Sequence, residues 1–184
     1  MGGIAMSPVF KKSQIAFATI GAVIAVSSLS YLADATRALM VLGSFGASTL
    51  LLFALPDATL AQPRAVIGGH LIASCIALIC LAVFGPVWWA VGAATGLAVG
   101  CMMWTRTLHP PAGSNAIIVF YAKPSWGLLL FSTLAGTILL IAIAIIYHRT
   151  TRRHSYPRYW CVSREADGGS AASNHVDTSA RVLP

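Results

Sequence analysis

LHPPAGSNAIIVFYA, residues 108–122, is the stretch that decides how this chain folds. Its two adjacent prolines, Pro110 and Pro111, remove two backbone donors and fix two φ angles immediately ahead of an apolar run. The ten residues from Gly113 to Ala122 make about 15 Å of helix, which is half of the roughly 30 Å hydrocarbon core of a membrane. The stretch therefore predicts a short helix that follows a break in the chain, and not a complete transmembrane span.

A second interrupted apolar stretch lies at residues 39–55. Its interruption is GSFGAS, residues 43–48, and a short apolar piece follows it at 49–55. With an offset of 67 residues, Gly46 aligns with Gly113 and Ser48 with Asn115. A long apolar run precedes each broken segment and another follows it, which predicts an internal two-fold repeat. Paired interrupted segments in the two halves of a membrane protein point to a transport site.

Four further apolar runs meet or approach the roughly 20 residues that a membrane-spanning helix needs. These runs are residues 15–32, 65–84, 88–105 and 126–147. The first run has an alternative interpretation as a signal peptide, because Lys11 and Lys12 precede it and residues 33–35 resemble a cleavage site. We predict an all-α polytopic membrane protein with four long transmembrane helices and two broken or re-entrant half-helices.

The composition independently excludes a soluble protein. Apolar residues make up 57% of the chain and charged residues 9%, whereas about a quarter of a typical soluble domain is charged. Six formal charges lie between residues 13 and 147, and the other eleven lie in the first twelve residues or the last 37. The net charge of +7 is therefore typical of basic flanks on an apolar body, and it does not indicate a nucleic-acid-binding surface.

The charge distribution also predicts the domain organisation and the orientation. We expect a basic cytoplasmic N-terminus at residues 1–14, a transmembrane domain at 15–147 and a polar, disordered cytoplasmic tail with surface histidines at 148–184. Basic residues at both ends of the apolar body favour cytoplasmic termini. This orientation requires an even number of crossings, and the sequence leaves four and six open. The expected location is the cytoplasmic (inner) membrane of a bacterium.

Motifs for catalysis and for metal or cofactor binding are not found in the sequence. It contains no HExxH, no GxSxG, no P-loop and no close pair of carboxylates. Its four cysteines show no CxxC or CxxxH spacing, so we expect neither a metal nor a cofactor. The chain is therefore not expected to be an enzyme.

The candidate binding site lies where the two broken segments are predicted to meet. Irregular backbone at membrane depth is tolerated only where it is buried in protein or lines a watery cavity. Two half-helix N-termini that face one point would surround it with N–H donors and positive dipole ends, which favours an anion. The predicted binding residues of the two segments are Gly46, Ala47, Ser48, His109, Pro110, Pro111, Gly113, Ser114 and Asn115.

Three further side chains are candidates because of their charge. No carboxylate lies inside the four long runs, so no acidic ring for a cation is predicted. Arg64 and Arg106 lie at the edges of runs, where they either steer an anion or anchor a helix at the interface. His70 lies six residues into its run, and either it belongs to the site or its neutral ring bonds a neighbouring helix. If transport is coupled to protons, His70 and His109 are the side chains of the apolar body that titrate near neutrality.

Small residues recur on the run at 88–105. Gly92, Gly96 and Gly100 are spaced four residues apart, as in helices whose backbones approach each other closely in a membrane. We therefore predict that this face packs against another helix.

Several of these stretches match the pattern of a known family. They are GAS (46–48), LLFALPD (51–57), AQPR (61–64), IGGH (67–70) and HPPAG (109–113). In this order, over roughly residues 10–147, they resemble the HPP family of integral membrane proteins, and residues 109–111 fall on the motif that names the family. The resemblance implies four transmembrane spans. Because some plant and cyanobacterial members are implicated in nitrite transport, it also implies nitrite as the first candidate substrate.

The predicted function is that of a channel or carrier for a small monovalent anion. The expected partners are a small inorganic anion and the lipid bilayer, with no nucleic acid and with a homo-oligomer as one option. The alternative function is a non-transporting membrane scaffold or assembly protein, in which the breaks serve helix packing. A transporter needs a polar cavity between the broken segments, whereas a scaffold can pack them dry.

Overall fold

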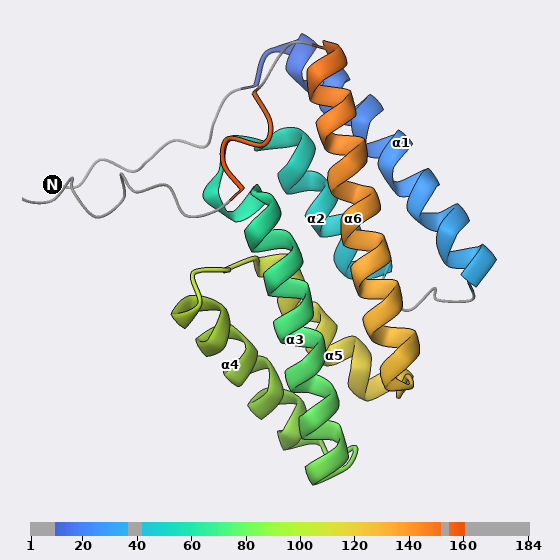
Figure 1. Cartoon of the computed structure of the whole chain (residues 1–184), viewed down its shortest axis with the longest axis vertical. Coiled ribbons are helices and arrows are strands. Elements are labelled where there is room, and N and C mark those ends of the chain that lie inside the picture. The colour runs from blue at the N-terminus through green and yellow to red at the C-terminus, as the bar shows by residue number, and fades with distance from the viewer. Residues whose placement is uncertain (1–9, 37–41, 152–154, 161–184) are drawn as a thin grey trace, which may run out of the picture.

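The computed structural model describes residues 10–36, 42–151 and 155–160, and these residues form an all-helical bundle (Figure 1). The α-helices of the described residues are α1 (Lys12–Thr36), α2 (Leu42–Ala54), α3 (Pro63–Phe84), α4 (Trp88–Trp104), α5 (Gly113–Ala122) and α6 (Trp126–Thr151). Two 3₁₀ turns, η2 (Thr59–Ala61) and η3 (Pro110–Ala112), precede α3 and α5. The prediction of an all-α fold is confirmed for this part of the chain.

Among the described residues, three helices are long and apolar enough to cross a membrane. They are α1, α3 and α6, and the last two contain 22 and 26 residues. The run at 88–105 forms α4, which at 17 residues is shorter than these three. Length and composition therefore support three of the four predicted long spans.

The break ahead of α5 lies where the two prolines predict it. The chain leaves α4 at Trp104, passes through Arg106 with a φ of 56° and turns through η3 before α5 begins at Gly113. The amide of Ala112 donates to the carbonyl oxygen of His109 at 2.9 Å. The helix then ends at Ala122, because Lys123 adopts a left-handed conformation with a φ of 46°.

The break predicted at residues 43–48 is not present, because α2 is continuous from Leu42 to Ala54. Glycine inside a helix costs only about 0.5–1 kcal/mol, and this segment has no proline to remove a donor. The hydroxyl of Ser48 lies 3.1 Å from the carbonyl oxygen of Ser44, one turn earlier in the same helix. Gly46, Ala47 and Ser48 therefore lie in the second turn of a helix and not at a free N-terminus. Residues 37–41, where the predicted segment begins, lie outside the described residues.

The packing face of α4 is formed by alanines and not by the glycines predicted from their spacing. Ala90, Ala94 and Ala98 are fully buried, and Ala98 packs in one apolar cluster with Ala73 of α3. The three glycines are exposed, and a Cβ added at any of them would meet no atom within 4 Å. The prediction therefore chose the wrong small residues of the same helix.

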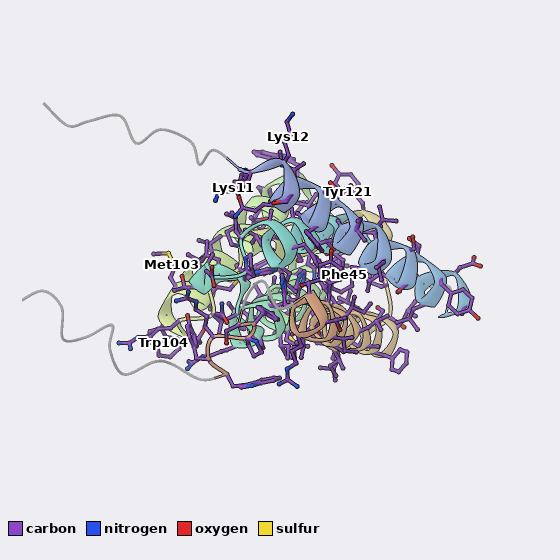
Figure 2. The ribbon with its side chains drawn as sticks, turned by 90° about the horizontal axis from the view of Figure 1, so that it is seen from above. Lys11, Lys12, Phe45, Met103, Trp104 and Tyr121 are labelled. Atoms are coloured by element: carbon purple, nitrogen blue, oxygen red, sulfur yellow. The ribbon has the colours of Figure 1, made fainter. Side chains whose placement is uncertain are left out.

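The bundle has a packed interior and an apolar exterior. In the view from above, Phe45 lies among the helices, while Lys12 and Trp104 lie at the periphery (Figure 2). Phe45 is 1% exposed, and it approaches α6 closely at Gly136, where a Cβ would lie 2.4 Å from its ring. Trp88 and Trp104 are each 87% exposed. Large exposed apolar side chains of this kind mark a surface that contacts lipid.

The part of the chain that packs in the bundle extends beyond residue 147, where the sequence predicted that the transmembrane domain ends. Helix α6 continues to Thr151, and His148 is buried, with Nε2 donating to the carbonyl oxygen of Leu52 at 2.8 Å. Burial raises the pKa of Tyr156, whose hydroxyl donates to the carbonyl oxygen of Ala61 at 2.9 Å. His154 and His175, the other histidines of the predicted tail, lie outside the described residues.

The two ends of the bundle that the structure describes lie together. Figure 1 shows the start of α1 and the end of α6 at the same, upper end. Residues 155–160 lie against the connection between α2 and α3, because the amide of Arg158 donates to Oε1 of Gln62 at 2.9 Å. The beginning of α1 and the segment after α6 therefore lie near the connection between α2 and α3 (Figure 1).

The close approach of the α4–α5 connection to α3 generates a test of the packing. A Cβ at Gly69 would lie 2.7 Å from the Cβ of His109 and 3.0 Å from the carbonyl oxygen of Thr107, so Gly69→Ala must displace backbone. We expect this variant to lower the thermal unfolding midpoint of the purified chain. The matched variant Gly96→Ala meets open space and is expected to raise stability by up to about 1 kcal/mol. An equal effect of the two alanines would contradict the packing.

Candidate functional site

Four fully buried polar side chains from four separate segments meet inside the bundle. We call this group the polar cluster, and its members are Ser48 of α2, His70 of α3, His109 of the α4–α5 connection and Asn115 of α5. Each of the four was predicted from the sequence as a binding residue. The structure brings them together through hydrogen bonds that span 22 to 61 residues of chain.

His109 and the connection that carries it are held against α3 and the turn before it. Its Nδ1 lies 2.7 Å from the carbonyl oxygen of Leu60, beside the turn that leads into α3. Gly69 leaves room for the Cβ of His109, because a Cβ on residue 69 would lie 2.7 Å from it. The other end of the same connection is tied to α3 by Arg64, whose Nη2 donates to the carbonyl oxygen of Thr105 at 2.8 Å. The connection between α4 and α5 is therefore fastened at one end to α3 and at the other to η2, the turn that precedes α3.

The polar cluster forms one continuous chain of hydrogen bonds. Oγ of Ser48 lies 2.8 Å from Nε2 of His109 and 2.9 Å from Nε2 of His70. Nδ1 of His70 lies 3.2 Å from Nδ2 of Asn115, which also donates to Oγ of Ser74 at 2.9 Å. The ring centroids of the two histidines are 5.1 Å apart. One hydroxyl thus joins two imidazole rings deep inside the bundle.

When both imidazole rings are neutral, the carbonyl oxygen of Leu60 fixes the direction of the hydrogen bonds that join the members of the polar cluster. A carbonyl oxygen only accepts, so Nδ1 of His109 carries the proton and Nε2 of the neutral ring accepts from Ser48. The Ser48 oxygen then accepts from Nε2–H of His70. Nδ1 of His70 is left without a proton and accepts from the amide of Asn115. Each group donates and accepts in the same direction along the chain.

One atom of the polar cluster has no partner. Oδ1 of Asn115 is buried and accepts no hydrogen bond. A buried acceptor without a donor costs about 1–3 kcal/mol. This oxygen is therefore a position at which a bound water or a ligand that carries a donor would gain a hydrogen bond.

Other predicted residues lie around the polar cluster without joining its hydrogen bonds. The amide of Gly113 donates to the carbonyl oxygens of Pro110 and Pro111, so it is not free as predicted, because the 3₁₀ turn uses it. The hydroxyl of Ser114 also donates to Pro111, at 2.7 Å. Residues 46 and 47 face away from the interior and are exposed, as are Pro110 and Arg106.

Two side chains of the network were not found from the sequence. Ser74 receives a hydrogen bond from Asn115, and its Oγ lies 3.3 Å from Oγ1 of Thr133 in α6. Ser74 follows His70 by four residues, a spacing that places both on one helix face and that was available as a signal. Thr133 carries no such signal, since it joins the network only through the packing of α6 on α3.

The network does not provide a metal site. Within the described segments of the chain, no three His, Cys, Asp or Glu side chains come close enough to hold a metal ion. The polar cluster offers two imidazole rings, and both Nε2 atoms are directed at the same serine.

The polar cluster generates a test of its role in packing. Asn115→Leu preserves the approximate volume but removes the hydrogen bonds to His70 and Ser74; because it also removes the unpaired Oδ1, we expect a net loss of about 1 kcal/mol of stability. The matched control is Thr137→Val, because this buried hydroxyl bonds only carbonyl groups of its own helix. Thermal unfolding of both variants in detergent measures the difference. Equal stability of the two variants would contradict a network that joins α3 to α5.

Comparison with known proteins identifies the family of the chain. The model of the HPP transmembrane region matches residues 7–157, which include the whole polar cluster. Two transmembrane proteins of Dictyostelium discoideum are similar, one 32% identical over 131 residues and the other 30% identical over 130. Each alignment covers 66% of this chain.

The chain spans less than half of the length of these two relatives, 45% of one and 42% of the other. No solved structure matches the chain. The family match covers the predicted HPP motif and the helices that surround it. The chain therefore belongs to the HPP family of transmembrane proteins.

Proposed function

We propose that the protein transports a small monovalent anion across the membrane, with nitrite as the first candidate. The observation that carries this proposal is the complete burial of the polar cluster inside an apolar helix bundle. Polar and ionisable side chains within a membrane are costly, and they characteristically line the paths of solutes and protons. A scaffold could pack the same helices with apolar side chains at lower cost.

The arrangement of the helices supports the same function. The helix contacts are the same in both halves of the bundle if α1, α2 and α3 correspond to α4, α5 and α6. The contact between α1 and α2 then corresponds to that between α4 and α5, α1–α6 corresponds to α4–α3, and α2–α6 corresponds to α5–α3. In Figure 1, a half-turn about the centre of the picture carries α1, α2 and α3 approximately onto α4, α5 and α6. This supports the predicted repeat, in which α4 corresponds to α1 and would be the fourth span. Repeats of opposite orientation are common in transporters, whose sites lie between the halves.

The distribution of charge favours an anion as the solute. The described residues contain two carboxylates, Asp34 and Asp57, and both are exposed. No carboxylate is therefore available in the polar cluster to hold a cation. Arg64 and Arg106 flank the start of the connection that leads to His109, where their positive charge would attract an anion.

The structure corresponds to a closed state in this proposal. Ser48, His70, His109 and Asn115 each have 0% exposed surface, so a solute at the polar cluster would be separated from both sides of the membrane. A transport cycle would open the site to each side in turn.

We also propose that both ends of the chain lie on the cytoplasmic side of a bacterial inner membrane, since basic residues flank the bundle at both ends.

Anion flux into liposomes that contain the purified full chain tests this function. We expect selective entry of nitrite in a comparison with nitrate, formate and chloride. His109→Ala should reduce the flux at least about tenfold, since it leaves the Leu60 carbonyl oxygen and the Ser48 hydroxyl of the buried site without this partner, and a buried polar group without a partner costs about 1–3 kcal/mol. Thr150→Ala is the matched control, because this exposed hydroxyl bonds only its own helix.

Two outcomes would contradict the proposal. Undiminished flux through His109→Ala would mean that the anion does not pass the polar cluster. No flux of any of the four anions, with the chain folded and inserted, would exclude them as substrates and favour the alternative of a membrane scaffold.

A further inference from the structure

We infer that the polar cluster takes up one proton, on Nε2 of His109, together with the transported anion. The hydroxyl of Ser48 turns between two acceptors as this proton binds and leaves. The inference rests on the proposed function, because it assigns a coupling ion to the same site.

The inference begins with the number of hydrogen bonds that the Ser48 hydroxyl can make. Its oxygen makes three contacts, with Nε2 of His109 at 2.8 Å, Nε2 of His70 at 2.9 Å and the carbonyl oxygen of Ser44 at 3.1 Å. A hydroxyl group donates one hydrogen bond and accepts two. Its single hydrogen can therefore point to Ser44 or to a deprotonated histidine nitrogen, but not to both.

With the Asn115 amide oriented as in the structure, Nε2 of His109 is the place where an added proton keeps all of these contacts. When both histidines of the polar cluster are neutral, the Ser48 hydrogen points to Nε2 of His109, which carries no proton. When a proton from solution binds this nitrogen, His109 becomes an imidazolium that donates to Leu60 through Nδ1 and to Ser48 through Nε2. The Ser48 hydrogen then turns to the carbonyl oxygen of Ser44. The Ser48 oxygen now accepts from both rings, and no heavy atom has to move.

His70 is not an equivalent place for this proton. Its Nδ1 accepts from the amide nitrogen of Asn115 at 3.2 Å, and its Nε2 already carries the hydrogen that it donates to Ser48. A proton added to Nδ1 would face the amide nitrogen of Asn115, so His70 could take this proton only if the Asn115 amide turned over and presented its oxygen. The geometry therefore separates the two rings, with His70 as a fixed donor and His109 as the ring that changes its charge.

The groups that surround His109 offer no negative charge to balance the added proton. Helix α2 contributes no titratable side chain. Helix α3 contributes His70, Arg64, whose guanidinium bonds Thr105, and the neutral thiols of Cys75 and Cys80. On the α2–α3 connection, Asp57 is 46% exposed and pairs with Arg158. The titratable side chain of α5, Tyr121, is 82% exposed at the far end of its helix.

An anion is the natural counter-charge for the protonated polar cluster. A buried imidazolium without a negative partner is strongly disfavoured. The N–H and O–H groups of the protonated polar cluster all have partners, so an anion bound beside it would be held by charge. It would reduce that penalty, and each binding event would favour the other by the same factor. The pair is electrically neutral, and it would cross the membrane as the equivalent of a weak acid.

Proton uptake on anion binding tests the inference. The full chain in lipid nanodiscs would be mixed with nitrite in weakly buffered solution that contains a pH indicator, and nitrite binding would be measured by calorimetry. We expect about one proton per bound nitrite, from reciprocal coupling. His109→Asn should abolish the uptake, because its amide nitrogen can still donate to Leu60 but cannot gain a proton. His148→Gln, a buried histidine on Leu52 outside the polar cluster, should leave it unchanged.

A second readout keeps the two proposals distinguishable. With ¹⁵N-labelled histidine, we expect Nε2 of His109 to become protonated as the pH falls, while Nε2 of His70 stays protonated throughout. Nitrite binding or flux without proton uptake would overturn this inference and leave anion transport intact. If no anion is bound or carried, the proposed function fails and coupling fails with it. Protonation of His70 before His109 would overturn the assignment of the proton.

Discussion

The hydrogen bond between Nδ1 of His109 and the carbonyl oxygen of Leu60 is the contact on which the rest of the interior depends. Because a carbonyl oxygen only accepts, this single bond determines which nitrogen of His109 carries its proton. That choice sets the direction of the bonds at Ser48 and His70 in turn. It also joins the connection before α5 to the connection before α3, so these two helices are positioned by the same atoms that order the site.

The Leu60 carbonyl is itself held by neighbours that are distant in the sequence. Ala61, the next residue, accepts from the buried hydroxyl of Tyr156 at 2.9 Å. The side chain of Gln62 donates to the carbonyl oxygens of Pro56 and Ala58 and accepts from the amide of Arg158. The segment after α6 thereby braces the turn that orients His109. An apolar bundle can hold a polar site in one geometry only if its irregular connections are satisfied in this way.

The sequence predicted the helices well where local chemistry determines them, and less well where packing does. Prolines at 110 and 111 necessarily break a helix, and the ten-residue α5 follows them as predicted. Glycine and serine only weaken a helix, so the break predicted at 43–48 was wrong and α2 runs through it. All four members of the polar cluster were candidates from the sequence, but their mutual contacts cross 22 to 61 residues. The Leu60 carbonyl had no signal at all, since a backbone oxygen is present at every residue.

The central claim is that the polar cluster binds a small monovalent anion. Anomalous diffraction from crystals of the full chain grown with bromide at mildly acidic pH tests it most directly, because bromide is monovalent and can be located by its own signal. The account predicts a bromide peak in contact with the polar cluster, beside His109, that is lost in His109→Asn crystals. Bromide found only on the protein surface, with the polar cluster unchanged and empty, would contradict it.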